Sequence, residues 1–126
     1  MKKIIKTAKA PAPLGPYNQA VLHGETLYLS GQIPIDPATN ELIDGTIEEE
    51  TEQVMKNLKA VLAEAGMNFE NVVKTSIFLS DMKNFAKVNA IYGNYFNDDT
   101  APARETVEVA NLPKYVNVEI SMIAIK

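Results

Sequence analysis

One arginine stands apart from the other basic residues of this chain. Of the 12 basic residues, eleven are Lys and one is Arg104, which follows Pro102 and Ala103 at the start of a strand-like run. A guanidinium group is a planar fork that binds a carboxylate through two parallel hydrogen bonds, and it stays charged when partly buried. Two interpretations remain open: Arg104 grips a planar acid, or it forms a salt bridge to a Glu that ties strands or subunits together.

Glu119 is the second candidate, because it interrupts the apolar run VNVEISMIAI. A carboxylate buried in such a run is costly unless it is paired. Burial can also raise the pKa of a carboxyl group toward the range in which it transfers protons. A salt-bridged structural Glu explains the residue equally well.

Four further residues could line a ligand site. Tyr17 follows a Gly-Pro pair that would hold it rigidly, and Ser30 and Gly31 break a strand where a backbone can approach a ligand closely. Asn89 flanks the apolar stripe of a predicted helix. Each has a simpler explanation, respectively loop packing, a bulge or turn, and a helix flank.

Several kinds of chemistry are excluded or disfavoured. The chain has no Cys and one His, His23, so disulfides, thiolate catalysis, a His-based triad and multi-His metal sites are excluded. Asp36 and Asp44 lack the ligand density of a calcium loop. No glycine-rich phosphate loop follows a strand. These residues therefore offer no candidate for a calcium loop, a multi-His metal site or a phosphate loop.

Length and composition indicate a single soluble domain spanning residues 1–126. Hydrophobic residues make up 46% of the 126 residues, and no run approaches the roughly 18 apolar residues of a membrane span. The formal net charge is −4 and no dense basic patch is present, which disfavours nucleic-acid binding. We expect a cytoplasmic protein that binds neither nucleic acid nor membrane.

Helical periodicity predicts two amphipathic helices. In the first, residues 47–66, the apolar positions recur at helical spacing, Thr46 and Glu49 form a capping box, and Gly66 ends the helix. The second covers residues 82–97. Its apolar side holds Phe85, Val88, Tyr92, Tyr95 and Phe96.

The remaining signals are strands, with a hairpin turn at residues 23–26. The predicted strands are residues 4–6, 19–22, 26–32, 72–80, 104–110 and 116–125. Strands, helix, strand, helix and strands in that order predict an α+β two-layer sandwich, with both helices on one face of a mixed sheet.

The last strand has one apolar face and one mixed face. Val118, Ile120, Met122 and Ala124 would pack on the helices, while the opposite face is a mixture of polar and apolar residues. We infer that other subunits cover the mixed face, although a tolerant exposed face would show the same pattern. Alternation groups Arg104 with Thr106 and Glu108, and we assign Arg104 to the mixed face with Glu119.

Five segments together resemble the Rid family of reactive intermediate deaminases. They are GPYNQA, YLSGQIPIDP, AEAGMNFENVVKTSIFLSDM, FAKVNAIYGNYF and APARETVEVANLPKYVNVEI, in this order along nearly the whole chain. The resemblance implies a chorismate-mutase-like fold and a homotrimer whose sheets line a central barrel, with ligand sites between subunits.

The resemblance also implies an activity. The family hydrolyses short 2-imino acids, such as 2-iminobutanoate and 2-iminopropanoate, to 2-oxo acids and ammonia without a cofactor. These imines arise from PLP-dependent threonine and serine dehydratases. Non-catalytic binding of small carboxylic acids, chaperone-like action and ribonuclease action are other family-associated roles, and the acidic balance makes the last the weakest.

The resemblance assigns roles residue by residue. Arg104 matches the residue that grips the substrate carboxylate, and Glu119 the residue that positions or activates water. The residues that match the family's cleft lining are Tyr17, Ser30, Gly31 through its main chain, Asn89, and Thr106 through its main chain.

Three positions depart from the family pattern. Glu105 replaces a small residue, Thr106 replaces a frequent Cys, and Ser121 replaces a frequent second Glu. Glu105 would compete with the substrate carboxylate if it turned toward Arg104, but alternation along the strand should point it away.

Overall fold

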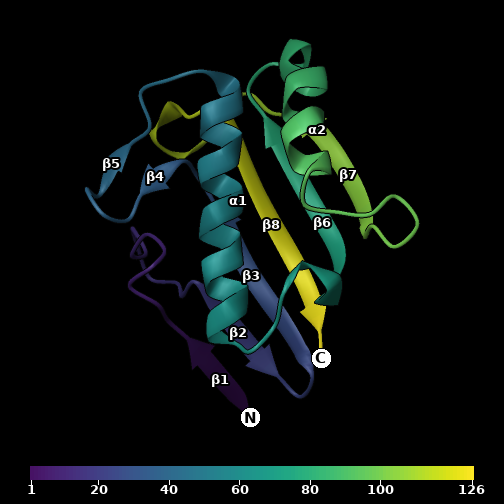
Figure 1. The fold of residues 1–126 in the computed structure, drawn as a ribbon. Helices are drawn as coiled ribbons and strands as arrows, with labels where there is room; N and C mark the ends of the chain where they lie inside the picture. Colours follow the sequence, from purple (N-terminus) through teal and green to yellow (C-terminus); the bar gives the residue numbers. More distant parts are fainter.

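The computed structural model describes residues 1–126 as a six-stranded mixed sheet with two helices on one face (Figure 1). The strand order is β1-β2-β3-β8-β6-β7, and only β6 and β7 pair in parallel. The elements of the main sheet and its helices are β1 (Lys2–Ile5), β2 (Ala20–His23), β3 (Thr26–Gln32), α1 (Ile47–Glu64), β6 (Val72–Leu79), α2 (Phe85–Gly93), β7 (Ala103–Glu108) and β8 (Val118–Ile125). The predicted α+β architecture is confirmed.

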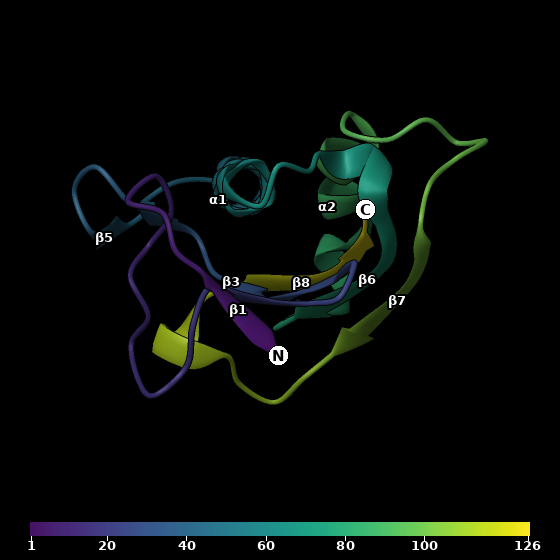
Figure 2. The ribbon, with the colours of Figure 1, turned by 90° about the horizontal axis from the view of Figure 1, so that it is seen from below.

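The helices α1 and α2 lie side by side on the same side of the sheet (Figure 2). The first begins as predicted: Thr46 caps it, with the Thr46 side chain accepting from the Glu49 amide and the Glu49 carboxylate accepting from the Thr46 amide. The helix ends shortly before Gly66, whose φ of +73° lies in the left-handed region that glycine adopts easily. No helix is long and apolar enough to cross a membrane.

The second helix is shorter than predicted. Residues Met82–Asn84 form a separate 3₁₀ turn, which the Asp81 side chain caps at the Lys83 amide (2.9 Å), and α2 ends at Gly93. The competing turn delays the start of the helix, because Asp side chains stabilise turns in place of a helical start. Val88 and Tyr92 are its buried residues.

Short elements that the sequence did not reveal complete the fold. Two-residue strands β4 (Ile35–Asp36) and β5 (Glu41–Leu42) form a separate hairpin, and 3₁₀ turns cover Phe69–Asn71 and Pro113–Tyr115. The buried Asn57 side chain holds the chain near β4 by donating to the carbonyls of Ile33 (3.3 Å) and Ile35 (2.9 Å).

The sheet face opposite the helices carries an apolar row. Strand register aligns Ile4, Val21, Tyr28 and Ile123 across β1, β2, β3 and β8. Tyr28 is 51% exposed, which is high for a residue in the middle of a sheet row. The mixed face predicted from alternation is therefore present and is exposed in the single chain.

The predicted direction of Arg104 is wrong. Parallel pairing sets Arg104 beside Thr75, and Thr75 is fully buried on the helix-covered face. Glu119 pairs with Phe78, whose position alternates with Thr75 and therefore faces the other side. Alternation within β7 gave the correct grouping of residues but could not say which group faces the helices, because that depends on the register with β6.

Candidate functional site

Arg104 lies on an aromatic floor supplied by α2. Its guanidinium carbon is 5.0 Å from the centroid of the Tyr92 ring and 5.7 Å from that of Phe85, within the range of cation–π attraction. The only ion pair in the chain joins Lys74 and Glu105, so Arg104 has no carboxylate partner. The single chain therefore does not contain the salt bridge that was one interpretation of Arg104. The guanidinium group of Arg104 is free to bind an acid.

The floor beneath Arg104 is firmly anchored. The buried Tyr92 hydroxyl donates to Thr75 Oγ1 at 3.1 Å, and the Tyr92 ring packs at 4.7 Å from that of Phe96. Burial raises the pKa of the Tyr92 phenol, which therefore stays neutral near pH 7. Because the Tyr92 ring is neutral and fixed, it limits the movement of the Arg104 guanidinium without neutralising its charge.

A cavity of about 210 Å³ opens beside this guanidinium, and we call it the Arg104 pocket. Its lining consists of Asn89, Tyr92, Gly93, Phe96, Asp98, Ala101, Pro102 and Arg104. The structure thus brings Arg104 and Asn89 together as expected. The aromatic floor was missed as a site feature because Phe85 and Tyr92 also fit the apolar stripe of a helix.

Glu119 lies on the opposite sheet face, against the main chain of Gly31. A Cβ atom added at Gly31 would lie 2.8 Å from Glu119 Cδ, so the carboxyl group rests where only glycine leaves room. Glu119 forms no ion pair, and its partial burial raises the pKa of its carboxyl group. This excludes a salt-bridged Glu in the single chain and favours a group suited to proton transfer.

Ser30 and Tyr17 lie on the same side of the sheet as Glu119. The register between β3 and β8 shifts between Leu29 and Gln32, which confirms the bulge interpretation of Ser30 and Gly31. Ser30 Oγ donates to the Asn18 carbonyl at 2.5 Å. Tyr17 and Gly31 line one narrow cleft. We call Tyr17, Ser30, Gly31 and Glu119 the Glu119 cluster.

The expected site residues therefore form two groups on opposite faces of the sheet. Arg104 and Asn89 lie on the helix face, and the Glu119 cluster lies on the other. Thr106 shares the face of Arg104 by pairing with Ile77, and its buried hydroxyl has no hydrogen-bond partner. No arrangement within one chain brings the two groups to one ligand.

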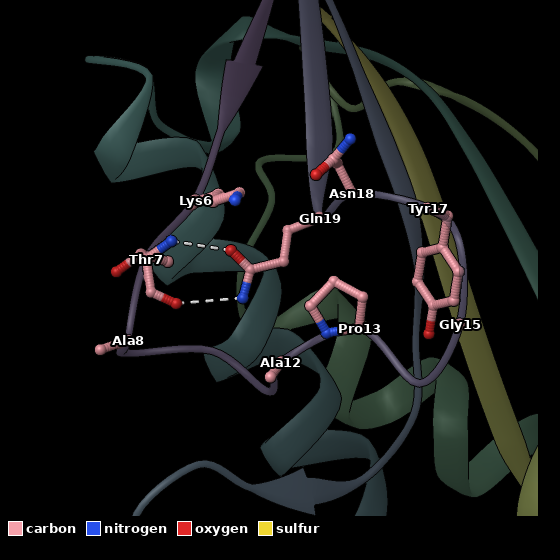
Figure 3. Close-up of a pocket in the computed structure, with 9 residues that line it drawn as sticks. All are labelled: Lys6, Thr7, Ala8, Ala12, Pro13, Gly15, Tyr17, Asn18 and Gln19. Carbon is pink, nitrogen blue, oxygen red and sulfur yellow. Dashed lines mark hydrogen bonds between the residues drawn. The ribbon is translucent and has the colours of Figure 1, made fainter.

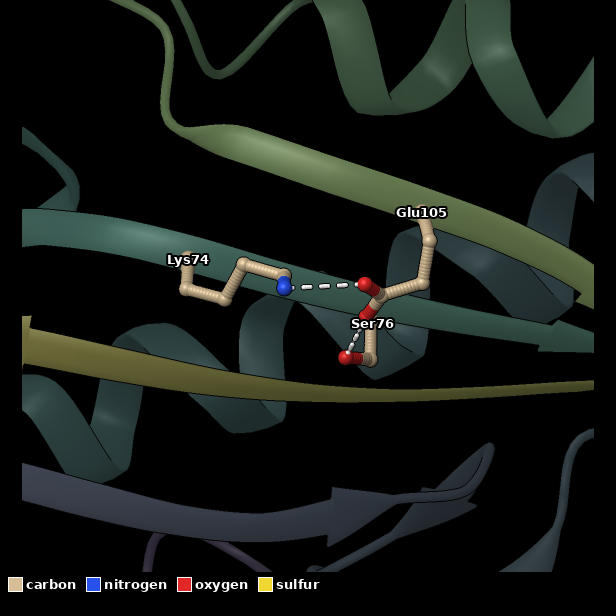
Figure 4. A network of polar contacts seen from close by, with 3 residues as sticks. All are labelled: Lys74, Ser76 and Glu105. Carbon is tan, nitrogen blue, oxygen red and sulfur yellow. Dashed lines mark hydrogen bonds and ion pairs between the residues drawn. The ribbon is translucent and has the colours of Figure 1, made fainter.

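Glu105 points away from Arg104, as alternation predicts. Its carboxylate pairs with Lys74 Nζ at 2.9 Å and accepts from the Ser76 hydroxyl (Figure 4). These hydrogen bonds lower the pKa of the Glu105 carboxyl, which stays ionised. It does not compete for the Arg104 fork of its own chain.

The largest cavity and the single histidine both lie away from Arg104. The largest cavity, about 470 Å³, lies beside Tyr17 and Gln19 (Figure 3). His23 is exposed at the end of β2, next to the turn, which agrees with its interpretation as a solvated residue.

Comparison with known proteins identifies the chain. A family model described as "Endoribonuclease L-PSP" matches residues 7–126. This chain belongs to the Rid (YjgF/RidA) family. A solved structure of a Yersinia pestis protein of unknown function of the conserved Rid family has a TM-score of 0.96 and 48% identity, and the match covers 100% of both chains.

Two curated relatives give the Rid protein a more specific context. A RutC family protein of Synechocystis is 57% identical over 98% of this chain and 95% of its own length. A mouse protein named 2-iminobutanoate/2-iminopropanoate deaminase is 47% identical over 100% of this chain and 93% of its own. The name of the mouse relative supports deaminase chemistry in the family at moderate identity, and the name of the Synechocystis relative states no activity.

The contact between Gly31 and Glu119 makes a testable prediction. In Gly31→Ala the added methyl group must displace the Glu119 carboxyl group, and because this is the movable end of a side chain we expect a loss of stability below about 1 kcal/mol, less than at an overpacked core site. Thermal unfolding would measure it. Gly93→Ala is the matched control, because nothing lies within 4 Å of a Cβ at that position. Equal melting temperatures for the two variants would contradict the close packing.

Proposed function

We propose that this Rid protein hydrolyses short 2-imino acids, such as 2-iminobutanoate and 2-iminopropanoate, to 2-oxo acids and ammonia. The observation that carries the proposal is the unpaired Arg104 fork, held over two aromatic rings at the mouth of a small cavity. A short carboxylic acid is the ligand that such a fork matches best. The name of the mouse relative supplies the substrate class.

The site is proposed to form between two copies of the chain. The Arg104 pocket of one copy would face the Glu119 cluster of another, since one chain places them on opposite sheet faces. The exposed apolar row on the open face, with Tyr28 at its centre, supports burial against further copies. We propose the homotrimer that the family resemblance implies, with chorismate-mutase-like sheets around a central barrel.

Substrate binding would start from the carboxylate. Two parallel hydrogen bonds from Arg104 fix its plane, and Asn89 offers an amide in the same pocket. The second copy contributes Tyr17, Ser30 and the Gly31 main chain as the opposite wall. Clamping the acid in this way orients the C=N carbon toward Glu119.

The chemical step would then need one held water molecule. The Glu119 carboxylate takes a proton from this water as its oxygen bonds to the imine carbon, and passes that proton to the nitrogen as the C=N double bond becomes a single bond, which gives a carbinolamine. Glu119 then takes the carbinolamine hydroxyl proton and passes it to the nitrogen, so that the C=O bond forms as the C–N bond breaks and ammonia leaves. Water and imino acid thus become 2-oxo acid and ammonia, with no metal or organic cofactor in the proposed route.

This chemistry places the protein after an enzyme that releases imines. PLP-dependent threonine and serine dehydratases produce such compounds, and the proposed role is to remove them in the cytoplasm before they react with other molecules. Free imines already hydrolyse in water, so the required acceleration is small compared with that of most enzymes.

A second role is compatible with the same pocket: a regulatory or chaperone-like trimer that binds small carboxylic acids without turnover. It is favoured by Arg104 itself, because a free guanidinium over aromatic rings binds an acid whether or not a reaction follows. The roles differ in their need for Glu119.

Arg104→Ala should abolish deamination, because the carboxylate clamp is lost, while the fold is retained. The assay generates 2-iminobutanoate with a threonine dehydratase in the presence of semicarbazide, which traps the imine that survives. Wild type should suppress semicarbazone formation, and Arg104→Ala should not. Lys87→Ala, which removes an exposed cation from α2, is the control and should behave as wild type. Full activity of Arg104→Ala would disprove the clamp.

Glu119→Gln distinguishes the deaminase role from the role of a protein that only binds small carboxylic acids. We expect a fall in kcat of roughly 100-fold or more, the usual contribution of general acid–base catalysis, with ligand affinity largely kept. In wild type, activity should fall with decreasing pH as Glu119 is protonated. Because burial raises its pKa, this loss begins at a higher pH than for an exposed Glu. Isothermal calorimetry with 2-oxobutanoate measures binding. Turnover unchanged in Glu119→Gln would overturn its catalytic role.

A further inference from the structure

The buried side chain of Gln19 holds a separate segment of main chain in place. It lies just before β2 and is 3% exposed. Its Oε1 accepts from the Thr7 amide at 2.7 Å, and its Nε2 donates to the carbonyls of Thr7 (3.0 Å), Ala10 (3.2 Å) and Pro11 (2.9 Å). Figure 3 shows this carboxamide between Thr7 and the loop that leads to Tyr17. One amide therefore binds four main-chain groups.

Apart from Gln19, the segment from residue 7 to residue 18 is held by the buried Ala10 and by a few other hydrogen bonds, such as that from the Lys9 amide to Thr7 Oγ1 (3.1 Å). It contains no helix or strand, and its only internal main-chain hydrogen bond joins the Tyr17 amide to the Gly15 carbonyl at 2.8 Å. Prolines at positions 11, 13 and 16 remove three donors that could have formed others. Buried main-chain carbonyls need partners, and Gln19 supplies them.

The same residue connects this segment to the bulge at Ser30. The Gln19 carbonyl accepts from the Ser30 amide at 2.9 Å, and the neighbouring Asn18 carbonyl accepts from Ser30 Oγ. At the tip of the segment, the Tyr17 hydroxyl accepts from the Leu14 amide at 3.0 Å. Tyr17, Pro11 and Pro13 then line one cleft with Gly31, the residue against which Glu119 packs.

Gln19 has no free donor to offer a ligand, although it borders the cavities beside Tyr17. Both Nε2 hydrogens are shared among three carbonyls, and the residue is 3% exposed. Its hydrogen bonds connect it to the site residues Tyr17 and Ser30.

We propose that Gln19 is a positioning residue that fixes the Tyr17–Ser30 wall of the site by pinning residues 7–11. The kinetic part of this inference rests on the proposed deaminase function. The structural part, which is the order of the segment, does not.

Gln19→Glu tests the inference with a change of only one group. The new carboxylate can still accept from the Thr7 amide, but it faces three carbonyls that no longer have a donor. This arrangement disfavours the ionised form and raises the pKa of the new carboxyl group, so acid should restore one donor and alkali should remove it. Gln53→Glu is the matched control, because Gln53 lies half-exposed on α1 and donates only to Asn57 Oδ1 (2.9 Å).

Two measurements on the full chain test the effect of Gln19→Glu. Hydrogen exchange of the Leu14 and Tyr17 amides, corrected for intrinsic rate, should be about tenfold faster than in wild type at pH 8, as expected for the loss of one or two hydrogen bonds. The difference should shrink at pH 5.5. KM for 2-iminobutanoate should rise roughly tenfold at pH 8 with a smaller change in kcat, because binding contacts are displaced. Circular dichroism should show a retained fold, and Gln53→Glu should match wild type throughout.

The outcomes separate this inference from the proposed function. Exchange at the wild-type rate in Gln19→Glu at pH 8 would overturn the inference, and so would faster exchange with KM unchanged in an active protein. If wild type shows no deamination, the proposed function fails. The role of Gln19 is then tested by hydrogen exchange alone. Faster exchange in Gln19→Glu at pH 8, with recovery at pH 5.5, supports that role.

Discussion

Successive residues of a β-strand point to opposite faces of the sheet, and this constraint governs the whole arrangement of the Rid site. The register between β6 and β7 turns Arg104 toward the helices, and that between β6 and β8 turns Glu119 away from them. The two groups best suited to bind and activate a substrate therefore cannot meet within one chain. In the proposed shared site, the helices complete the half that holds Arg104, and the bulge at Gly31 with the segment bound by Gln19 completes the half that holds Glu119.

The charges of the two halves complement each other. Arg104 is partly buried with aromatic rings beneath it and forms no ion pair, although Asp98 lines the same pocket, and Glu119 is partly desolvated and forms no ion pair. Each group alone bears a cost of desolvation that an opposite charge or a charged ligand would offset. The open sheet face adds an apolar row that favours contact with another copy. In the proposed trimer, the site therefore forms only when the subunits assemble.

Much of the fold could be predicted because the signals were local. The cap at Thr46 and the spacing of apolar residues defined α1, and the turn at residues 23–26 defined the β2–β3 hairpin. Arg104 was noticeable by its rarity, and the Gly31 bulge by its residue type. The side to which Arg104 points was not predictable, since it depends on a parallel pairing of segments about thirty residues apart. Gln19 gave no signal either, because its role lies in contacts with residues 8 to 12 positions away.

The most direct test of a site shared between copies is complementation between two inactive variants. Arg104→Ala and Glu119→Gln chains with different affinity tags would be co-expressed, the mixed oligomers isolated through both tags, and their activity measured by semicarbazide trapping. We expect about a third of wild-type activity, because every trimer that contains both chains places an intact Arg104 opposite an intact Glu119 at one of its three contacts. No activity above that of either variant alone would contradict the shared site and the mechanism built on it.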